Sequence, residues 1–156
     1  MWKHRPALII FCLAILGACS QSDPLMHGED ALPSSIGNLS GTYVLNGIDP
    51  LGNEYTGHLE VSDTERIGIY DLQWIVTEAF QLGTGRLDGN LLEVEWRTSD
   101  QAAQEVSGTA TFTVTVDGEL YGSKHVDGDD GEWRETAYPA GRESRVPGRE
   151  FLVAGR

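Results

Sequence analysis

The chain has 156 residues, with 24 acidic and 11 basic side chains and a formal net charge of −13 at neutral pH. A surface this acidic is repelled by phosphate backbones and by anionic headgroups. We therefore expect no nucleic-acid partner, and any attachment to a membrane has to come from a covalent lipid rather than from charge.

The N-terminal residues have the pattern of an exported and lipid-modified protein. Lys3 and Arg5 precede an apolar stretch at positions 7–16, which has the length of a signal-peptide core and is too short to cross a bilayer as a helix. The stretch ends in Leu16-Gly17-Ala18-Cys19. This order resembles the lipobox of bacterial lipoproteins, in which the cysteine thiol takes a diacylglyceryl group. A secretory signal with an incidental cysteine is the alternative.

The lipobox resemblance implies that residues 1–18 are a signal peptide and that Cys19 is lipidated, with fatty acyl chains such as palmitate as the membrane anchor. Ser20 follows the cysteine, and outer-membrane lipoproteins generally lack Asp at that place. The expected location is therefore the outer membrane of a Gram-negative envelope, on the periplasmic face rather than the surface. With Cys12 removed and Cys19 acylated, no disulfide can form, so an apolar core must stabilise the fold.

Composition divides the rest of the chain into a spacer, a folded domain and a tail. Residues 19–39 hold the lipidated cysteine and a stretch of small and polar residues without periodicity, which predicts a flexible spacer. Residues 139–156 contain glycines, arginines and Pro147 and predict a loose C-terminal tail. A late edge strand at positions 151–153 is the alternative for that tail. The folded domain is expected at residues 40–138.

Within this domain apolar and polar residues alternate, which predicts strands with one wet face. Leu92, Val94 and Trp96 alternate with charged neighbours, and no window shows a helical stripe. Asp-Gly pairs at 88–89 and 117–118 are typical of two-residue hairpin turns. Eight short strands are expected, beginning near Thr42, Tyr55, Ile67, Ala79, Asn90, Ser107, Glu119 and Glu132.

Short hairpins between successive strands favour an all-β fold, a small antiparallel up-and-down β-barrel of about eight strands, because closing the meander removes its open edges. A two-sheet β-sandwich is the alternative, since the number of strands does not decide closure. A barrel of about eight strands is just wide enough to be filled by side chains or to hold one small molecule.

Several short motifs carry a resemblance to a known group of proteins. They are Gly41-Thr42-Tyr43, Tyr55-Thr56-Gly57-His58-Leu59, Gly83-Thr84-Gly85-Arg86-Leu87-Asp88-Gly89-Asn90-Leu91, Trp96 and Asp117-Gly118-Glu119-Leu120-Tyr121-Gly122. Together they resemble small exported bacterial β-proteins that are often named fibronectin-binding proteins. The resemblance implies a shared architecture and, through the name, an adhesin for host matrix protein; it supplies no catalytic residues. After Gly122 the chain departs from the pattern, with Lys124 where an aromatic residue is common.

The densest set of oxygen ligands is the acidic segment that follows His125. Its weak candidates for a cation are Asp127, Asp129, Asp130 and Glu132. Their spacing does not match the EF-hand loop, because the fifth position counted from Asp127 is Gly131. His27 and His58 add no zinc motif. We therefore expect a solvated turn, with no metal and no cofactor.

The sequence also lacks the usual patterns of catalysis. Beyond the predicted signal peptide it has no Gly-x-Ser-x-Gly or Ser-x-x-Lys motif, and Glu93 and Glu95 share a wet strand face, so we expect no enzyme activity. The aromatic residues that are candidates for lining a ligand cavity are Tyr43, Tyr70, Trp74 and Trp96. A packed aromatic core is the alternative.

These features predict a lipid-anchored envelope β-barrel module with a binding or structural role. One alternative is a calycin-like carrier of a small hydrophobic ligand, because Gly41-Thr42-Tyr43 also looks like the start of avidin-type and lipocalin-type barrels. The adhesin is the other alternative. The sequence does not predict the identity of the ligand or of a protein partner.

Overall fold

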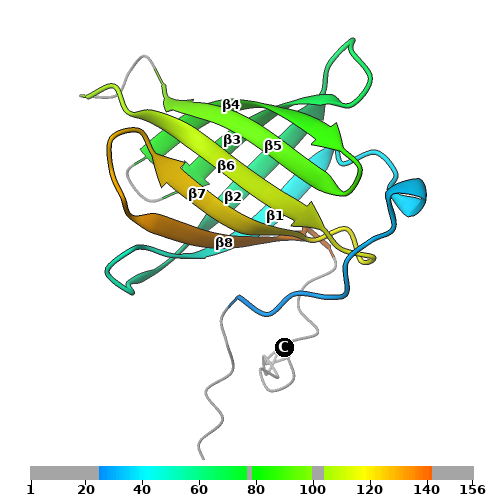
Figure 1. Ribbon diagram of the computed structural model, residues 1–156, viewed down its shortest axis with the longest axis horizontal. Helices are drawn as coiled ribbons and strands as arrows, with labels where there is room; N and C mark the ends of the chain where they lie inside the picture. The colour runs from blue at the N-terminus through cyan, green and yellow to red at the C-terminus, as the bar shows by residue number, and fades with distance from the viewer. Residues whose placement is uncertain (1–24, 77–78, 100–103, 142–156) are drawn as a thin grey trace, which may run out of the picture.

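The computed structural model describes residues 25–76, 79–99 and 104–141. Eight antiparallel strands, each paired with its neighbours along the chain, close into a barrel by pairing the first strand with the last (Figure 1). They are β1 (Gly41–Ile48), β2 (Glu54–Asp63), β3 (Ile69–Val76), β4 (Ala79–Asp88), β5 (Leu91–Thr98), β6 (Ser107–Val114), β7 (Leu120–Val126) and β8 (Glu132–Pro139). The predicted up-and-down barrel is confirmed, the two-sheet sandwich is excluded, and each strand begins within two residues of its expected start.

The period-two pattern determines which side chains fill the barrel. On β5, Leu92, Val94 and Trp96 are buried, while the glutamates between them are exposed. The same alternation on the other strands produces one continuous core, in which Trp74 and Phe112 are the largest fully buried side chains. Each buried aromatic ring removes a large apolar area from water, which stabilises the fold.

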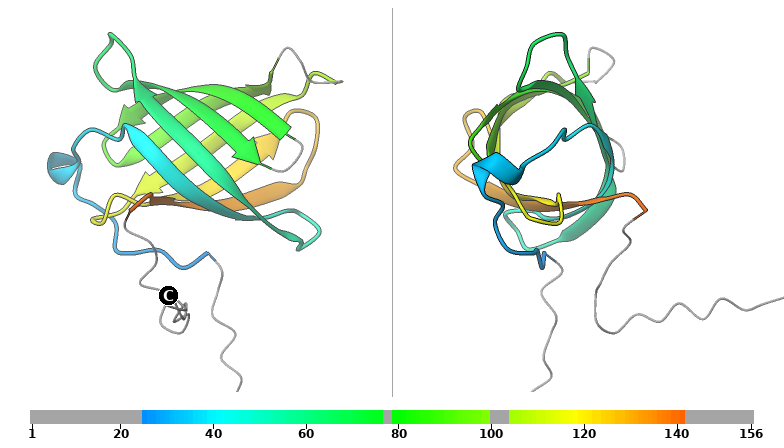
Figure 2. Two further views of the ribbon diagram at one scale, coloured as in Figure 1. Left: turned by 180° about the vertical axis from the view of Figure 1, so that it is seen from behind. Right: turned by 90° about the vertical axis from the view of Figure 1, so that its right-hand side faces the viewer.

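The two ends of the barrel are built differently. At the covered end, the chain that precedes β1 crosses the opening, and the short 3-10 helix η1 (Pro33–Ser35) lies at its edge (Figure 2). Leu39 is buried there, and its carbonyl accepts a hydrogen bond of 2.6 Å from the hydroxyl of Tyr43. The opposite end carries the β1–β2, β3–β4, β5–β6 and β7–β8 connections, and we call it the open end.

Part of the predicted flexible spacer is instead packed against the barrel. In residues 25–39, Leu25 and Ala31 are buried, and Asp30 forms an antiparallel bridge with Thr115. The amide of Ala31 also donates a 2.9 Å hydrogen bond to the last carbonyl of β6. The spacer prediction is wrong for this stretch because its order comes from backbone pairing with a distant strand, which polar composition does not reveal.

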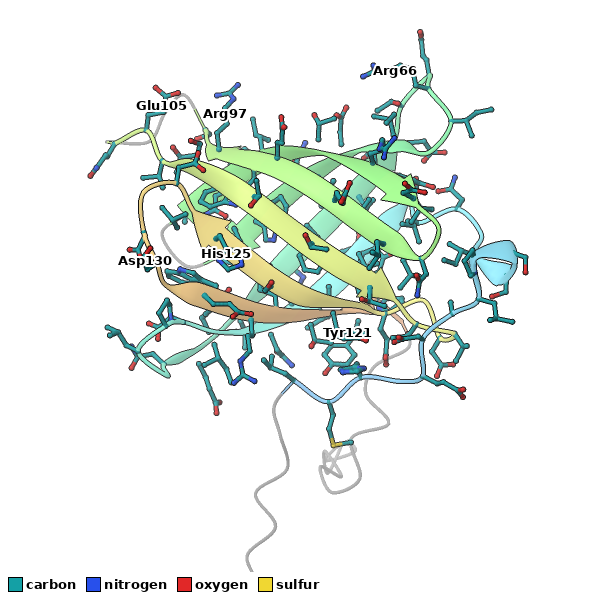
Figure 3. The ribbon with its side chains drawn as sticks, viewed as in Figure 1. Arg66, Arg97, Glu105, Tyr121, His125 and Asp130 are labelled. Carbon is teal, nitrogen blue, oxygen red and sulfur yellow. The ribbon has the colours of Figure 1, made fainter. Side chains whose placement is uncertain are left out.

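We call residues 25–31 the N-terminal strap, and it lies along the outer face of β7 and β8. The ring of His27 stacks on that of Tyr121 at a centroid distance of 3.4 Å, and Asp30 accepts a 2.7 Å hydrogen bond from the Tyr121 hydroxyl (Figure 3). Thr136 faces outward on β8 but is buried, because the strap covers it and its hydroxyl donates to the carbonyl of Leu25.

Some predictions fall on residues that the structure does not describe. Cys19, the signal peptide and the remaining spacer residues up to position 24 lie outside the described residues, as does the tail from position 142. Pro139, where the tail was expected to begin, is the last residue of β8, so the folded domain ends slightly later than predicted. Among the described residues, no helix is long and apolar enough to cross a membrane.

Candidate ligand-binding site

A pocket of about 270 Å³ lies inside the open end of the barrel. We call it the open-end pocket. Asp49, Asn53 and Glu54 line it where β1 connects to β2, and the aromatic side chains of Tyr55, Trp96 and Trp133 line it further in, with Val76, Ala79 and Val126. Two of its lining residues are charged yet buried: Lys124 is 5% exposed and Glu135 is 2% exposed, and Gln81 lies beside them.

Lys124 is held by aromatic rings as well as by polar groups. Its Nζ lies 4.5 Å from the ring centroid of Trp74 and 4.3 Å from that of Trp96. An ammonium group over an indole face is attracted by the electron-rich ring, and the attraction strengthens when water is excluded. The same Nζ donates a hydrogen bond to the side-chain oxygen of Gln81 and lies 3.9 Å from a carboxylate oxygen of Glu135.

Glu135 gathers donors from two further strands. Its carboxylate accepts a hydrogen bond of 2.6 Å from the hydroxyl of Tyr55 on β2 and one of 3.0 Å from the indole nitrogen of Trp74 on β3. A buried charge is tolerated only when it is paired and hydrogen-bonded, and this carboxylate meets both conditions. Lys124, Glu135, Tyr55, Gln81 and Trp74 therefore form one polar network inside an otherwise apolar barrel.

Burial changes the acidity of two members of this network. Desolvation lowers the pKa of the Lys124 ammonium, and the negative charge of Glu135 opposes part of that effect. Desolvation raises the pKa of the Tyr55 hydroxyl far above its usual range, and the charge of Glu135 raises it further. Tyr55 therefore stays protonated and keeps donating to the carboxylate, while Lys124 gives up its proton more easily than an exposed lysine.

The local sequence explains how Tyr55 reaches the network. Gly47 on β1 is paired with Tyr55, and a Cβ atom at Gly47 would lie only 2.2 Å from the Tyr55 ring. The missing side chain lets the ring lie over β1, where it also meets Trp133 edge-on at a centroid distance of 5.7 Å. Gly47 is thus a glycine that the site needs for close approach, not for a turn.

The structure divides the predicted aromatic candidates between two places. Trp96 lines the open-end pocket, and Trp74 lies against Lys124 and stacks on Phe112 in the core. Tyr43 and Tyr70 are buried near the covered end and do not line this pocket. The four residues therefore do not form one cavity wall.

Sequence reasoning missed the polar members of the site. Lys124 and Glu135 occupy inward-facing positions of β7 and β8, where the alternation calls for apolar residues. That interruption is a signal, because a charged residue in phase with buried neighbours has to find a partner inside the fold. Tyr55 and Gln81 gave no comparable signal, since polar residues are common near strand ends.

The acidic candidates lie outside the barrel, with Asp127, Asp129 and Asp130 on the β7–β8 loop and the exposed Glu132 at the start of β8. Asp127 accepts a 2.6 Å hydrogen bond from the hydroxyl of Ser107, and Asp129 accepts one of 2.6 Å from the amide of Gly131. Asp130 lies on this loop and His125 on the outer face of β7 (Figure 3). Within the described ranges, no three His, Cys, Asp or Glu side chains are grouped so that they could hold a metal ion.

A larger, more open hollow of about 750 Å³ runs across the outer face of β3 to β6. Its ionisable lining residues include Asp71, Glu95 and Arg97, all of which are exposed to solvent. Charges on such a surface stay hydrated and carry no burial cost, so they do not point to a ligand. The candidate site is therefore the open-end pocket, which is lined by the buried ion pair.

Comparison with known proteins adds information on the fold. No known protein family and no curated protein matches the sequence. Among solved structures, the chain is similar to a redesigned β-barrel, with a TM-score of 0.54 and 11% sequence identity, over 72% of this chain and 97% of the other. A similarity at this level of identity supports the barrel architecture alone.

Proposed function

We propose that this protein is a lipid-anchored module of the bacterial cell envelope whose barrel binds one small, mostly apolar ligand in the open-end pocket. The observation that carries the binding role is the ion pair of Lys124 and Glu135 beside that pocket. Burying two charges costs several kcal/mol per ion before their attraction is counted, and a purely structural barrel gains more from apolar packing. A charged pair at the base of a cavity is useful when a ligand has to be oriented.

The shape and lining of the pocket support a small-ligand role. Ligand sites are typically concave and apolar, with a few polar groups that fix orientation. Tyr55, Trp96 and Trp133 supply apolar surface, and Lys124 supplies a hydrogen-bond donor at the base. The volume of about 270 Å³ is at the lower end of the range for drug-sized ligands, which favours a molecule of fragment size.

Ligand binding is tested by titrating the protein with neutral aromatic and aliphatic molecules while following tryptophan emission. Trp96 and Trp133 line the pocket, so a bound molecule should quench or shift their emission in a saturable way. Trp133→Ala should weaken binding, whereas Phe80→Ala, on the outer face of β4, should not. If no molecule in the panel gives saturation, or if both variants bind equally, the binding role is wrong.

The envelope anchor is supported by the lipobox resemblance at Leu16-Gly17-Ala18-Cys19. It is tested by labelling cells with palmitate and fractionating their membranes. The unchanged chain should take up label and sediment with the outer membrane, and Cys19→Ala should remain unprocessed, soluble or mislocalised. A mature Cys19→Ala protein in the outer membrane would rule out this anchor.

A further inference from the structure

Lysine is used in an unusual way in this chain. Only two of the 11 basic residues are lysines, Lys3 and Lys124, and all others are arginines. Lys124 is the sole lysine in the described part of the chain, and it lies inside the barrel with 5% of its surface exposed. Lysine is ordinarily a surface residue, so the burial of Lys124 is opposite to the usual preference.

Lysine is also not the expected partner for a permanent buried ion pair. Arginine keeps its charge at any physiological pH and can bind a carboxylate with two parallel hydrogen bonds, which suits a fixed buried pair. An amine differs because it can lose its proton and then acts as a nucleophile. Lys124 and Glu135 are joined by one contact, with 3.9 Å between Nζ and a carboxylate oxygen. A contact of this length suits an amine that has to be released for reaction.

Burial shifts the protonation of the amine towards its neutral form, against the attraction of the indole rings and of Glu135 for the ammonium. The rings of Trp74 and Trp96 lie on Nζ at 4.5 and 4.3 Å and exclude water from it. The titratable groups that face it are Glu135, which stabilises the ammonium, and Tyr55, which hydrogen-bonds to the same carboxylate. The net result is a lowered pKa for Lys124, so a larger fraction of the amine is neutral at physiological pH than in an exposed lysine.

We propose that Lys124 captures a neutral aldehyde in the open-end pocket as a reversible imine. This inference rests on the proposed function, because it uses the same pocket. The neutral Nζ attacks the carbonyl carbon, a C–N bond forms, and the π electrons of the carbonyl move to oxygen. Transfer of a proton from nitrogen to that oxygen gives a carbinolamine. Loss of the hydroxyl with one proton as water, while the nitrogen lone pair forms the C=N bond, completes the imine without any oxidant or reductant.

Glu135 is placed to move the proton in this sequence. Its carboxylate, 3.9 Å from Nζ, can accept the proton that leaves the nitrogen and return it to the departing hydroxyl. The hydroxyl of Tyr55 and the indole of Trp74 hold that carboxylate in place at 2.6 and 3.0 Å. Glu135 is therefore assigned the role of acid and base, and Tyr55 that of a positioning residue.

The charge of the protein indicates which carbonyl compounds can reach the amine. Asp49 and Glu54 line the pocket near its opening, and the whole chain carries a net charge of −13. Anionic carbonyl compounds such as keto acids are repelled by this field, whereas a neutral aldehyde is not. Aromatic walls and a volume of about 270 Å³ favour a flat, conjugated aldehyde of fragment size.

The test traps the imine with cyanoborohydride, using 6-methoxy-2-naphthaldehyde as the probe and the unprocessed full-length chain, which still carries Lys3, in detergent micelles. Mass spectrometry of the intact protein and of its peptides should show one adduct, on Lys124, with Lys3 and the α-amine labelled far less. In denaturant Lys124 has the pKa of an exposed lysine, so a smaller fraction of its amine is neutral at neutral pH. Labelling of Lys124 should then slow by about tenfold for each unit by which the fold lowers its pKa. Equal labelling of Lys3 and Lys124 in the folded protein would overturn the proposal.

Two variants keep the test independent of folding problems. Lys124→Arg keeps a positive charge beside Glu135 but cannot form an imine, and the double variant Lys124→Met with Glu135→Gln removes both charges together. The unchanged protein should bind the matching alcohol, 6-methoxy-2-naphthalenemethanol, by tryptophan quenching, and neither variant should give a trapped adduct at position 124. If the unchanged protein binds the alcohol but traps no aldehyde on Lys124, the imine is wrong and the pocket stands. If it binds neither, the ligand-binding function is wrong as well.

Discussion

The ammonium nitrogen of Lys124 lies 3.9 Å from the carboxylate of Glu135, and both side chains are almost completely enclosed by the barrel. The two residues come from neighbouring strands, β7 and β8, and each has further partners on strands across the barrel. Because the pair is shielded from water, its energetics differ from those of a surface salt bridge, which contributes about 0 to 1 kcal/mol. Removing either side chain leaves the charge of the other buried without its opposite charge.

We expect Glu135→Gln and Lys124→Met each to destabilise the fold by about 3 to 5 kcal/mol, because each leaves an uncompensated buried charge or breaks the network around it. The double variant should recover much of that loss, since replacing a whole buried pair is often close to neutral. Urea unfolding followed by circular dichroism measures all three. Additive losses in the double variant would show that the two side chains are not energetically coupled.

Gly47→Ala is expected to weaken ligand binding and to lower stability by about 1 to 3 kcal/mol, the usual effect of overpacking. The new Cβ would lie 2.2 Å from the Tyr55 ring, so the ring has to move and its hydrogen bond to Glu135 is strained or lost. Gly37→Ala is the matched control, because a Cβ there meets nothing within 4 Å. Isothermal titration with the naphthalenemethanol probe and urea unfolding check both effects. Equal behaviour of the two variants would contradict the role given to Gly47.

The strands could be predicted from sequence because each depends on local information. Alternation of Leu92, Val94 and Trp96 with charged residues determines both the strand and its inner face, and Asp-Gly at 117–118 determines the turn before β7. Closure of the barrel is favoured over a sandwich because an open meander of this length leaves two unpaired edges. These properties required no knowledge of which distant residues meet.

The site and the strap could not be predicted in the same way, because both depend on distant partners. Tyr55 meets Glu135 across a separation of 80 positions in the chain, a contact that exists only once β1 has paired with β8. The strap depends likewise on the pairing of Asp30 with Thr115. Trp96 could be placed inside the barrel by its alternation, but nothing local indicated that Lys124 would lie against its ring.

Stability in alkali is expected to depend on Tyr43. Burial raises the pKa of its hydroxyl from 10.0 to about 12 in the folded protein, and Tyr70 contributes to the shift. A raised folded-state pKa means that the folded state holds its proton longer, so the contribution to stability is complete below pH 10 and is lost as the pH rises towards 12. Tyr43→Phe should therefore show a shallower loss of stability across this window.

The comparison between wild type and Tyr43→Phe is made by urea unfolding at a series of pH values. At neutral pH the variant should be less stable by about 1 kcal/mol, because it lacks the hydrogen bond to the carbonyl of Leu39. The difference between the two proteins should shrink as the pH rises from 10 towards 12. A constant difference over that range would show that Tyr43 titrates alike in the folded and unfolded states.

Calcium is expected to change the melting temperature no more than magnesium does at equal ionic strength. Asp127 and Asp129 already accept hydrogen bonds from Ser107 and Gly131, so their carboxylates are turned towards donors of the protein itself. Calcium takes about six to eight oxygen ligands, which this loop would have to supply by breaking those contacts. Thermal unfolding at millimolar concentrations of each ion provides the measurement. A calcium-specific rise of several degrees that disappears in Asp129→Ala would contradict this expectation, because only an ion bound to the folded state stabilises it by mass action.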